Sequence, residues 1–171
     1  MSDTRSRVRN CISRNPGIHF NGITRKLDIA TGQTQYHVRQ LWRNDRVQRE
    51  EICGRTHYYL PAYSDWERGA IALLRRETTR EIVLVLLEQE RASPGDITDR
   101  LGVARSTVEW HLSNLTEYDV VRKEADATGE GIAVELNEPS TVYRLLREVE
   151  PRFSERLVDR FSRFADELLS E

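Results

Sequence analysis

The sequence lacks long hydrophobic runs and has few cysteines, and each absence argues against a class of protein. None of its 171 residues belongs to an uninterrupted apolar run of the length, about 18 residues, that a membrane-spanning helix needs. The first ten residues, MSDTRSRVRN, contain no apolar segment of the kind found in a signal peptide. We therefore expect a cytoplasmic protein that has no contact with membrane.

Two cysteines, Cys11 and Cys53, are too few and too far apart to predict a disulfide framework or a zinc cluster. Cys11 aligns with an apolar position of the internal repeat described below, so we expect it to be buried. Cys53 stands beside Gly54 at a predicted turn and is expected to be more exposed. A redox role for Cys53 stays open as the lesser alternative, because the sequence shows no partner cysteine nearby.

Motifs for catalysis are also missing. The chain has no glycine-rich phosphate loop, no HExxH or CxxC motif, and no serine in a nucleophile-elbow context. We therefore expect no enzymatic activity, no metal site and no cofactor.

The charge is unevenly divided along the chain, although the formal net charge is only −2. Residues 1–60 contain 11 Lys and Arg against 5 Asp and Glu, a balance of +6, whereas residues 61–171 contain 15 against 23, a balance of −8. Because phosphate contacts dominate affinity for DNA, the basic half is the one expected to contact nucleic acid.

One stretch, ITDRLGVARSTVEWHLSNLTEYDVVRKE over residues 97–124, predicts two short helices joined by a tight turn. Gly102 stands where the first helix ends and where a backbone of positive φ is needed. Val108, Leu112 and Leu115 then recur at helical spacing and leave the polar residues on the other faces. Two helices joined in this way form a helix-turn-helix, and the strand that follows predicts a wing.

The same stretch occurs twice. A shift of 74 positions without a gap places residues 23–50 over residues 97–124, with nine identities in 28 positions that fall mainly on packing positions. His37 and His111 share one repeat position, which favours a structural role for both over metal binding. The period is too long for a solenoid and is typical of two small domains in tandem.

The periodicity predicts a mostly α fold with small β-wings: two tandem winged helix-turn-helix domains plus a C-terminal helix. The expected divisions are a basic first domain at 1–62, a linker helix at 63–77, an acidic second domain at 78–138 and C-terminal helices at 139–171. In the first domain we predict a helix at 3–14, a second helix through Phe20, Ile23 and Leu27, a recognition helix at 32–44 and wing strands at 47–52 and 56–60. The second domain should follow the same order, with strands at 120–125 and 132–136.

The string STVEWHLSNL, which begins at Ser106 and precedes a predicted strand and wing, resembles the recognition region of ArsR and MarR regulators. The tandem arrangement is similar to archaeal transcriptional regulators with two such domains, and the ArsR metal-sensing cysteine motif is absent. The resemblance implies that the recognition helix enters the major groove of DNA and that the wing follows the backbone or minor groove. The DNA-binding candidates that it implies are Gln33, Gln35, Tyr36, Arg39, Arg43, Arg49 and Arg55, with His57 on the neighbouring strand as a further candidate.

The second domain departs from this pattern. Its predicted recognition helix offers Arg105 but also Glu109 and Glu117, and acidic groups would repel phosphates. Trp110 on the outward side instead suggests a protein contact. Beyond residue 150 an apolar stripe recurs at helical spacing, and it is expected either to pack on the chain's own helices or to form a dimer interface. The stripe consists of Phe153, Leu157, Phe161, Phe164 and Leu168.

These features predict a sequence-specific transcriptional regulator of double-stranded DNA. A homodimer would place two basic domains on two half-sites, so its operator should be partly palindromic. An effector pocket between the domains stays open, although no group of residues singles one out. The alternative is a tandem winged-helix adaptor that binds protein in a transcription or chromosome-organising assembly, because winged helices also serve that purpose.

Overall fold

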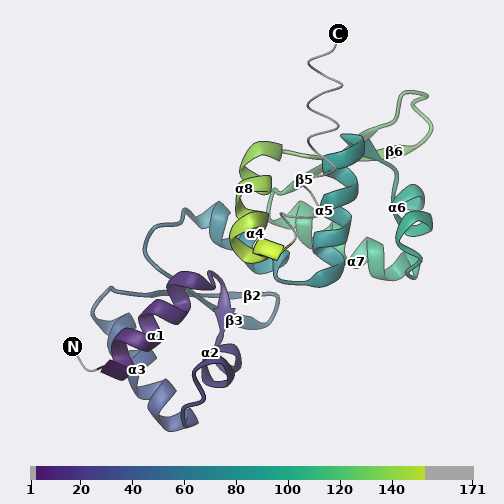
Figure 1. The fold of residues 1–171 in the computed structure, drawn as a ribbon. Helices are drawn as coiled ribbons and strands as arrows, with labels where there is room; N and C mark the ends of the chain where they lie inside the picture. Colours follow the sequence, from purple (N-terminus) through teal and green to yellow (C-terminus); the bar gives the residue numbers. More distant parts are fainter. Residues whose placement is uncertain (1–2, 153–171) are drawn as a thin grey trace.

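The computed structural model describes residues 3–152, and within them the chain runs through the same series of seven elements twice (Figure 1). We call residues 3–76 unit one and residues 77–152 unit two. Unit one contains α1 (Asp3–Arg14), β1 (Ile18–His19), α2 (Phe20–Leu27), α3 (Thr31–Arg43), β2 (Gln48–Ile52), β3 (Arg55–Tyr59) and α4 (Asp65–Leu74). Unit two contains α5 (Glu77–Gln89), β4 (Arg91–Ala92), α6 (Pro94–Leu101), α7 (Arg105–Glu117), β5 (Val121–Ala125), β6 (Ile132–Leu136) and α8 (Pro139–Val149).

Both units are winged helix-turn-helix folds, which confirms the mostly α fold with small wings expected from the sequence. In each unit a hairpin and a two-residue strand form an antiparallel sheet, with the order β1-β3-β2 in unit one and β4-β6-β5 in unit two. The hairpins and the helices of the two motifs lie within one or two residues of their predicted bounds, whereas α4 is shorter than the linker helix predicted at 63–77. Strands β1 and β4 were not predicted, because two residues are too short to show a periodic pattern.

The turn between the two helices of each motif depends on one left-handed residue. Gly102 ends α6 with a φ of 66°, as the sequence predicts, and Asp28 occupies the equivalent position after α2 with a φ of 50°. Aspartate tolerates this conformation better than most side chains, which allows unit one to make the turn without glycine. Asp45 and Asp119, one repeat apart, are a second such pair after α3 and α7.

Helix α4 joins the two units through a shared core instead of separating them. Its residues from Gly69 to Leu74 are all buried, and its first turn is fixed by a capping box between Ser64 and Glu67. A buried cluster that we call the second core contains this helix, the apolar residues of unit two, and Ile52 and Tyr59 from the hairpin of unit one. The first core, built on α1, α2 and α3, is separate and includes Tyr58.

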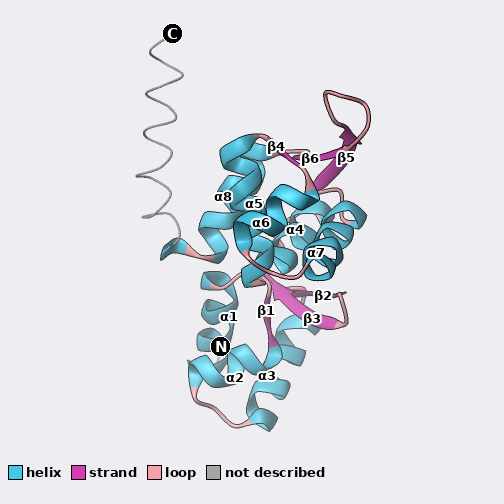
Figure 2. Cartoon of the chain, turned by 90° about the vertical axis from the view of Figure 1, so that its right-hand side faces the viewer, coloured by secondary structure: helices cyan, strands magenta, loops and turns pink. Residues whose placement is uncertain are grey.

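The hairpin β2–β3 is therefore covered on both faces. Tyr58 points into the first core, whereas its neighbour Tyr59 points into the second and donates its hydroxyl to the carbonyl of Arg68 on α4 at 2.8 Å. Figure 2 shows this hairpin at the level where the two units meet. Successive side chains of a strand point to opposite faces, so a strand with apolar residues at neighbouring positions can hold two layers together.

The predicted apolar stripe of the C-terminal helix, Phe153, Leu157, Phe161, Phe164 and Leu168, lies outside the described residues. Helix α8, which precedes it, packs on α4 and α5 through Val142, Leu145 and Leu146. In the part of the chain that the structure describes, no helix is both long enough and apolar enough to cross a membrane.

Candidate nucleic-acid interface

Helix α3 has one buried face and one polar, exposed face. Thr34, His37, Val38 and Leu41 are buried against unit one. The solvent side carries the candidates that the resemblance singled out, and Tyr36 is 56% exposed. The exposed candidates on this helix are Gln33, Gln35, Tyr36, Arg39 and Arg43. No residue of α3 is acidic, so this surface offers amide, phenol and guanidinium groups without a carboxylate.

The start of α3 is fixed by threonine hydroxyls. Thr34 donates to the carbonyl of Ala30 at 3.3 Å, and the hydroxyl of Thr24 on α2 donates to that of Thr34, also at 3.3 Å. These bonds tie the two helices of the motif to each other at the turn. The exposed face of α3 is consequently carried by a helix that packing and hydrogen bonds hold in place.

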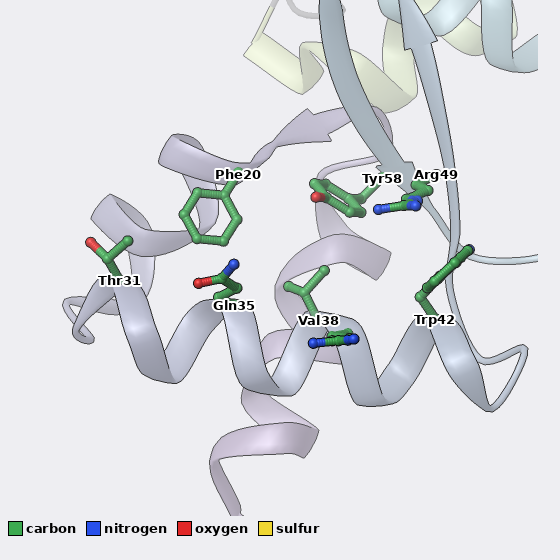
Figure 3. Close-up of a pocket in the computed structure, with 8 residues that line it drawn as sticks. Phe20, Thr31, Gln35, Val38, Trp42, Arg49 and Tyr58 are labelled. Atoms are coloured by element: carbon green, nitrogen blue, oxygen red, sulfur yellow. The ribbon is translucent and has the colours of Figure 1, made fainter.

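A groove of about 570 Å³ lies between α3 and the base of the hairpin (Figure 3). Its lining combines apolar side chains with the polar candidates Gln35, Arg39 and Arg49. Arg49 is stacked on Trp42, with its guanidinium carbon 3.9 Å from the centre of the indole ring. The remaining lining residues are Phe20, Thr31, Val38, Trp42 and Tyr58.

Sequence reasoning missed Trp42, although it is the side chain that orients Arg49. Trp42 follows Arg39 by three positions on α3 and is 40% exposed. Its spacing from Arg39 on the predicted recognition helix, with Arg49 on the strand that follows, was the signal in the sequence. The ring restricts the rotamers of Arg49 and holds its charge at the mouth of the groove.

The tip of the hairpin is made by Cys53 and Gly54, both with positive φ. Two such residues form the kind of turn that a two-residue hairpin favours. Cys53 is half-buried as expected and donates its thiol to the side-chain oxygen of Asn114 on α7 at 3.4 Å. The sequence placed Arg55 at the tip, but it is the first residue of β3, where it is exposed.

The expectation that His57 contacts DNA is wrong. His57 is only 4% exposed, because β3 places it on the face of the sheet that packs inward. Its Nδ1 lies 2.6 Å from the carbonyl oxygen of Gly17, to which it donates, and its ring stacks on His19 across the strand pair. Burial lowers the pKa of His57 below its ordinary value of 6.5.

The equivalent helix in unit two presents a different surface. Trp110, the counterpart of Tyr36, is 50% exposed, and the guanidinium of Arg76 lies 5.3 Å from the centre of its ring. Glu109 is flanked by Arg105 at 3.9 Å and Lys123 at 3.7 Å. The repulsion of phosphates expected from Glu109 is therefore reduced by these two cations, whereas Glu117 remains exposed.

His37, His111 and Cys11 are buried inside the two units, as expected of residues that have a structural role. His37 and His111 are each 9% exposed, and His111 Nδ1 lies 2.9 Å from the hydroxyl of Thr79. Cys11 is buried in the first core, as the repeat predicts. Among the described residues, 3–152, no group of three or more His, Cys, Asp or Glu side chains is arranged to hold a metal ion.

Comparison with known families agrees with the two-unit architecture. A family model described as an N-terminal HTH domain matches residues 2–71, and one described as a helix-turn-helix domain matches residues 73–124. The second match agrees with the likeness of unit two to ArsR regulators.

A curated relative, the HTH-type transcriptional regulator MJ1398 of Methanocaldococcus jannaschii, is 27% identical over 138 residues. The match covers 81% of this chain but 34% of the relative, so this chain spans about a third of that protein's length.

Two solved structures resemble this chain less closely than the family models do. Overoxidized AbfR bound to DNA aligns with 79% of this chain and 89% of its own at 13% identity and a TM-score of 0.38. A hypothetical protein of Pyrobaculum spherical virus aligns with 67% of this chain and 73% of its own at 18% identity and the same TM-score. The two family matches, one for each unit, agree with the repeated fold and support two tandem helix-turn-helix domains.

Proposed function

We propose that the chain is a sequence-specific transcriptional regulator in which α3 of unit one enters the major groove of DNA. The observation that carries this proposal is the exposed face of α3, which presents glutamine, tyrosine and arginine side chains and no carboxylate on the second helix of the motif. Helix α7 occupies the same place in unit two but contains Glu109 and Glu117. Unit one is therefore the better reader of a polyanion.

The side chains on α3 suit different parts of the duplex. Glutamine can form two hydrogen bonds with adenine, and arginine can do so with guanine, so Gln33, Gln35 and Arg39 are assigned to base edges. Tyr36 supplies an exposed aromatic ring beside them. Arg43 in the last turn and the stacked Arg49 on β2 are assigned to phosphates, which position the protein without reading sequence.

In this proposal the hairpin contacts DNA mainly through its base and less through its tip. Arg49 lies at the base and faces the groove beside α3, whereas Cys53 at the tip is held against α7. Arg55 is exposed next to the tip and is assigned to the DNA backbone. A deep insertion of the tip into a minor groove would require the contact between Cys53 and Asn114 to break.

We further propose that two copies act together on a partly palindromic operator, because a twofold dimer would place two α3 helices on two half-sites. The apolar spacing of residues 153–168 in the sequence supports a dimer contact. Sedimentation equilibrium of the wild type and of a Leu157→Asp/Phe161→Asp variant tests this part. A dimer that the variant converts to monomers is expected, and a monomeric wild type would contradict it.

The experiment for the main proposal is selection of fragmented DNA from the source genome by the purified protein, followed by sequencing. An Arg39→Glu/Arg43→Glu variant is compared with an Arg105→Glu/Arg122→Glu variant, which reverses two charges in unit two. A short motif that the first variant loses and the second keeps is expected. Failure of the wild type to enrich any motif would overturn sequence-specific reading and favour the protein-binding adaptor.

A further inference from the structure

Arginines from three segments lie near enough to His19, His57 or His111 to act on the charge of these rings. Arg25 comes from α2, Arg55 from β3, and Arg75 and Arg76 from the turn between α4 and α5. The guanidinium of Arg75 donates to the carbonyl of Pro16 at 3.1 Å, which brings this turn against unit one. We call Arg25, Arg55, Arg75 and Arg76 the junction patch.

The arginines near the three histidines lower the pKa of each ring. Burial is the main cause that lowers the pKa of His19, and the positive charges of Arg75, Arg55 and Arg25 lower it further. For His57 burial lowers the pKa most, the hydrogen bond to Gly17 opposes it, and the charges of Arg75 and Arg76 add to the lowering. Arg76 acts in the same direction on His111. The side-chain charges that act on these three histidines are therefore positive.

Ion pairs elsewhere in the molecule make the contrast clear. On the exposed face of the unit-two sheet, Arg91 and Arg122 are each paired with both Glu124 and Glu135. Among the residues that the structure describes, no ion pair involves a member of the junction patch. The carboxylate of Glu150 is near enough to act on Arg75, but Arg80 acts on Arg75 in the opposite direction and more strongly.

Arg76 is half-buried, and an aromatic ring of unit two positions its guanidinium. Its guanidinium is held over the ring of Trp110, and its Nη1 is buried without a hydrogen-bond partner. A buried donor without a partner costs free energy unless a ligand or water satisfies it. Arg55 is exposed nearby on the hairpin, whose tip rests against α7 one helical turn from Trp110.

We propose that the junction patch binds phosphates of the DNA backbone on the flank of the segment read by α3, and so extends the interface from unit one to the edge of unit two. This inference rests on the proposed function. DNA is the ligand that fits, because the patch draws cations from separate elements across a surface and begins on α2, the helix directly before α3. Contacts of this kind add affinity without adding sequence preference.

The test is the salt dependence of DNA binding by Arg55→Gln and Arg76→Gln variants, measured by fluorescence anisotropy with the selected duplex and with a scrambled one. Each lost phosphate contact should lower the slope of log affinity against log salt by about 0.9. Affinity should fall by a similar factor, about five-fold or more near physiological salt, for both duplexes. An Arg76→Lys variant keeps the charge and should restore the slope.

The matched control is Arg147→Gln. Arg147 is an exposed arginine of α8 that does not belong to the junction patch, and its guanidinium lies over the ring of Tyr143. It should bind with the slope of the wild type, and thermal melting confirms that each variant is folded. If both junction variants keep the wild-type slope, the inference is overturned even where α3 variants lose the motif. If the slope falls but no motif is ever enriched, the inference stands and sequence-specific reading fails. Absence of all DNA binding overturns both.

A second arm separates the DNA backbone from a free anion. The melting temperature is measured with inorganic phosphate and with tripolyphosphate, at constant ionic strength, for the wild type and Arg76→Gln. Little stabilisation, and none that depends on Arg76, is expected. Stabilisation that requires Arg76, with an unchanged salt slope for DNA, would show that the patch binds a diffusible anion and would overturn the assignment to DNA.

Discussion

The thiol of Cys53 in the hairpin of unit one donates to the side-chain oxygen of Asn114 on the recognition helix of unit two, across 61 positions of sequence. A hairpin that would be a free wing in an isolated domain is here part of the contact between two domains. Its second face is covered as well, because Ile52 and Tyr59 belong to the core that α4 shares with unit two. The two units are therefore expected to unfold together.

The close approach of Gly17 to α4 tests this coupling. Gly17 has a φ of 73°, and a Cβ added there would lie 2.7 Å from Cγ2 of Ile71. Gly17→Ala should lower the free energy of unfolding by about 1–3 kcal/mol, since both the backbone conformation and the space are unfavourable. Ile71→Ala should cost about 2–5 kcal/mol through the cavity it leaves.

Chemical denaturation of the double variant gives the decisive comparison. Removal of Cγ2 relieves the clash, so the double variant should lose less stability than the sum of the two single variants. Strict additivity would show that Gly17 and Ile71 do not meet in solution.

Stability should fall as the pH drops below the ordinary histidine pKa of 6.5. Burial lowers the pKa of His57 in the folded protein, so between that lowered pKa and 6.5 the unfolded chain binds a proton that the folded chain does not. The contribution is full above pH 6.5 and is lost as the pH falls to the folded value. His19 and His111 act in the same direction.

Denaturation curves between pH 7.5 and 5 of the wild type and a His57→Gln variant measure this effect. Glutamine can still donate to the carbonyl of Gly17, so the variant should fold, with a loss of about 1 kcal/mol at pH 7.5 and a shallower dependence on pH. An equally steep curve for the variant would assign the dependence to other groups.

The two arginines on α3 should have different effects on DNA binding. Arg39→Ala should cost about 1–3 kcal/mol on the best sequence and relax the preference at one base pair, because a base contact is lost. Arg43→Ala should weaken binding to all sequences alike and lower the salt slope by about one, because a phosphate contact is lost. Selection with sequencing and salt titrations of both variants make the comparison. Identical behaviour of the two would contradict the division of roles.

The stack of Arg49 on Trp42 predicts that these residues act together. Arg49→Ala and Trp42→Ala should each reduce affinity for DNA, the second because Arg49 loses a contact worth about 0.5–1 kcal/mol and no longer holds its orientation. The double variant should bind no more weakly than Arg49→Ala. Affinities that fall additively would show that Trp42 contacts DNA on its own account.

The elements of both units could be predicted from the sequence, but their contact could not. Thr34, Val38 and Leu41 recur at helical spacing and define the buried face of α3 without knowledge of any other element. Gly102 and the Cys53–Gly54 pair mark their turns for local reasons of backbone conformation. Such signals lie within a few residues of each other.

The contact of the hairpin β2–β3 with unit two depends on residues that are far apart in the sequence. Ile52 and Tyr59 are apolar on the second face of the wing, which is a sign of a second covering layer, yet nothing local indicates that α4 and α7 supply it. The burial of His57 follows from the same layer, which is why its expected contact with DNA was wrong. Trp42 and Arg49 meet only because β2 returns along α3.

The most direct test of the central claim is photocrosslinking to the selected duplex from two matched positions. A benzophenone amino acid replaces Tyr36 on α3 or Ile132 on β6, which are 56% and 53% exposed. Reading of the major groove by unit one predicts crosslinks from position 36 to bases within the motif and none from position 132. Crosslinks from position 132 with none from position 36 would contradict it.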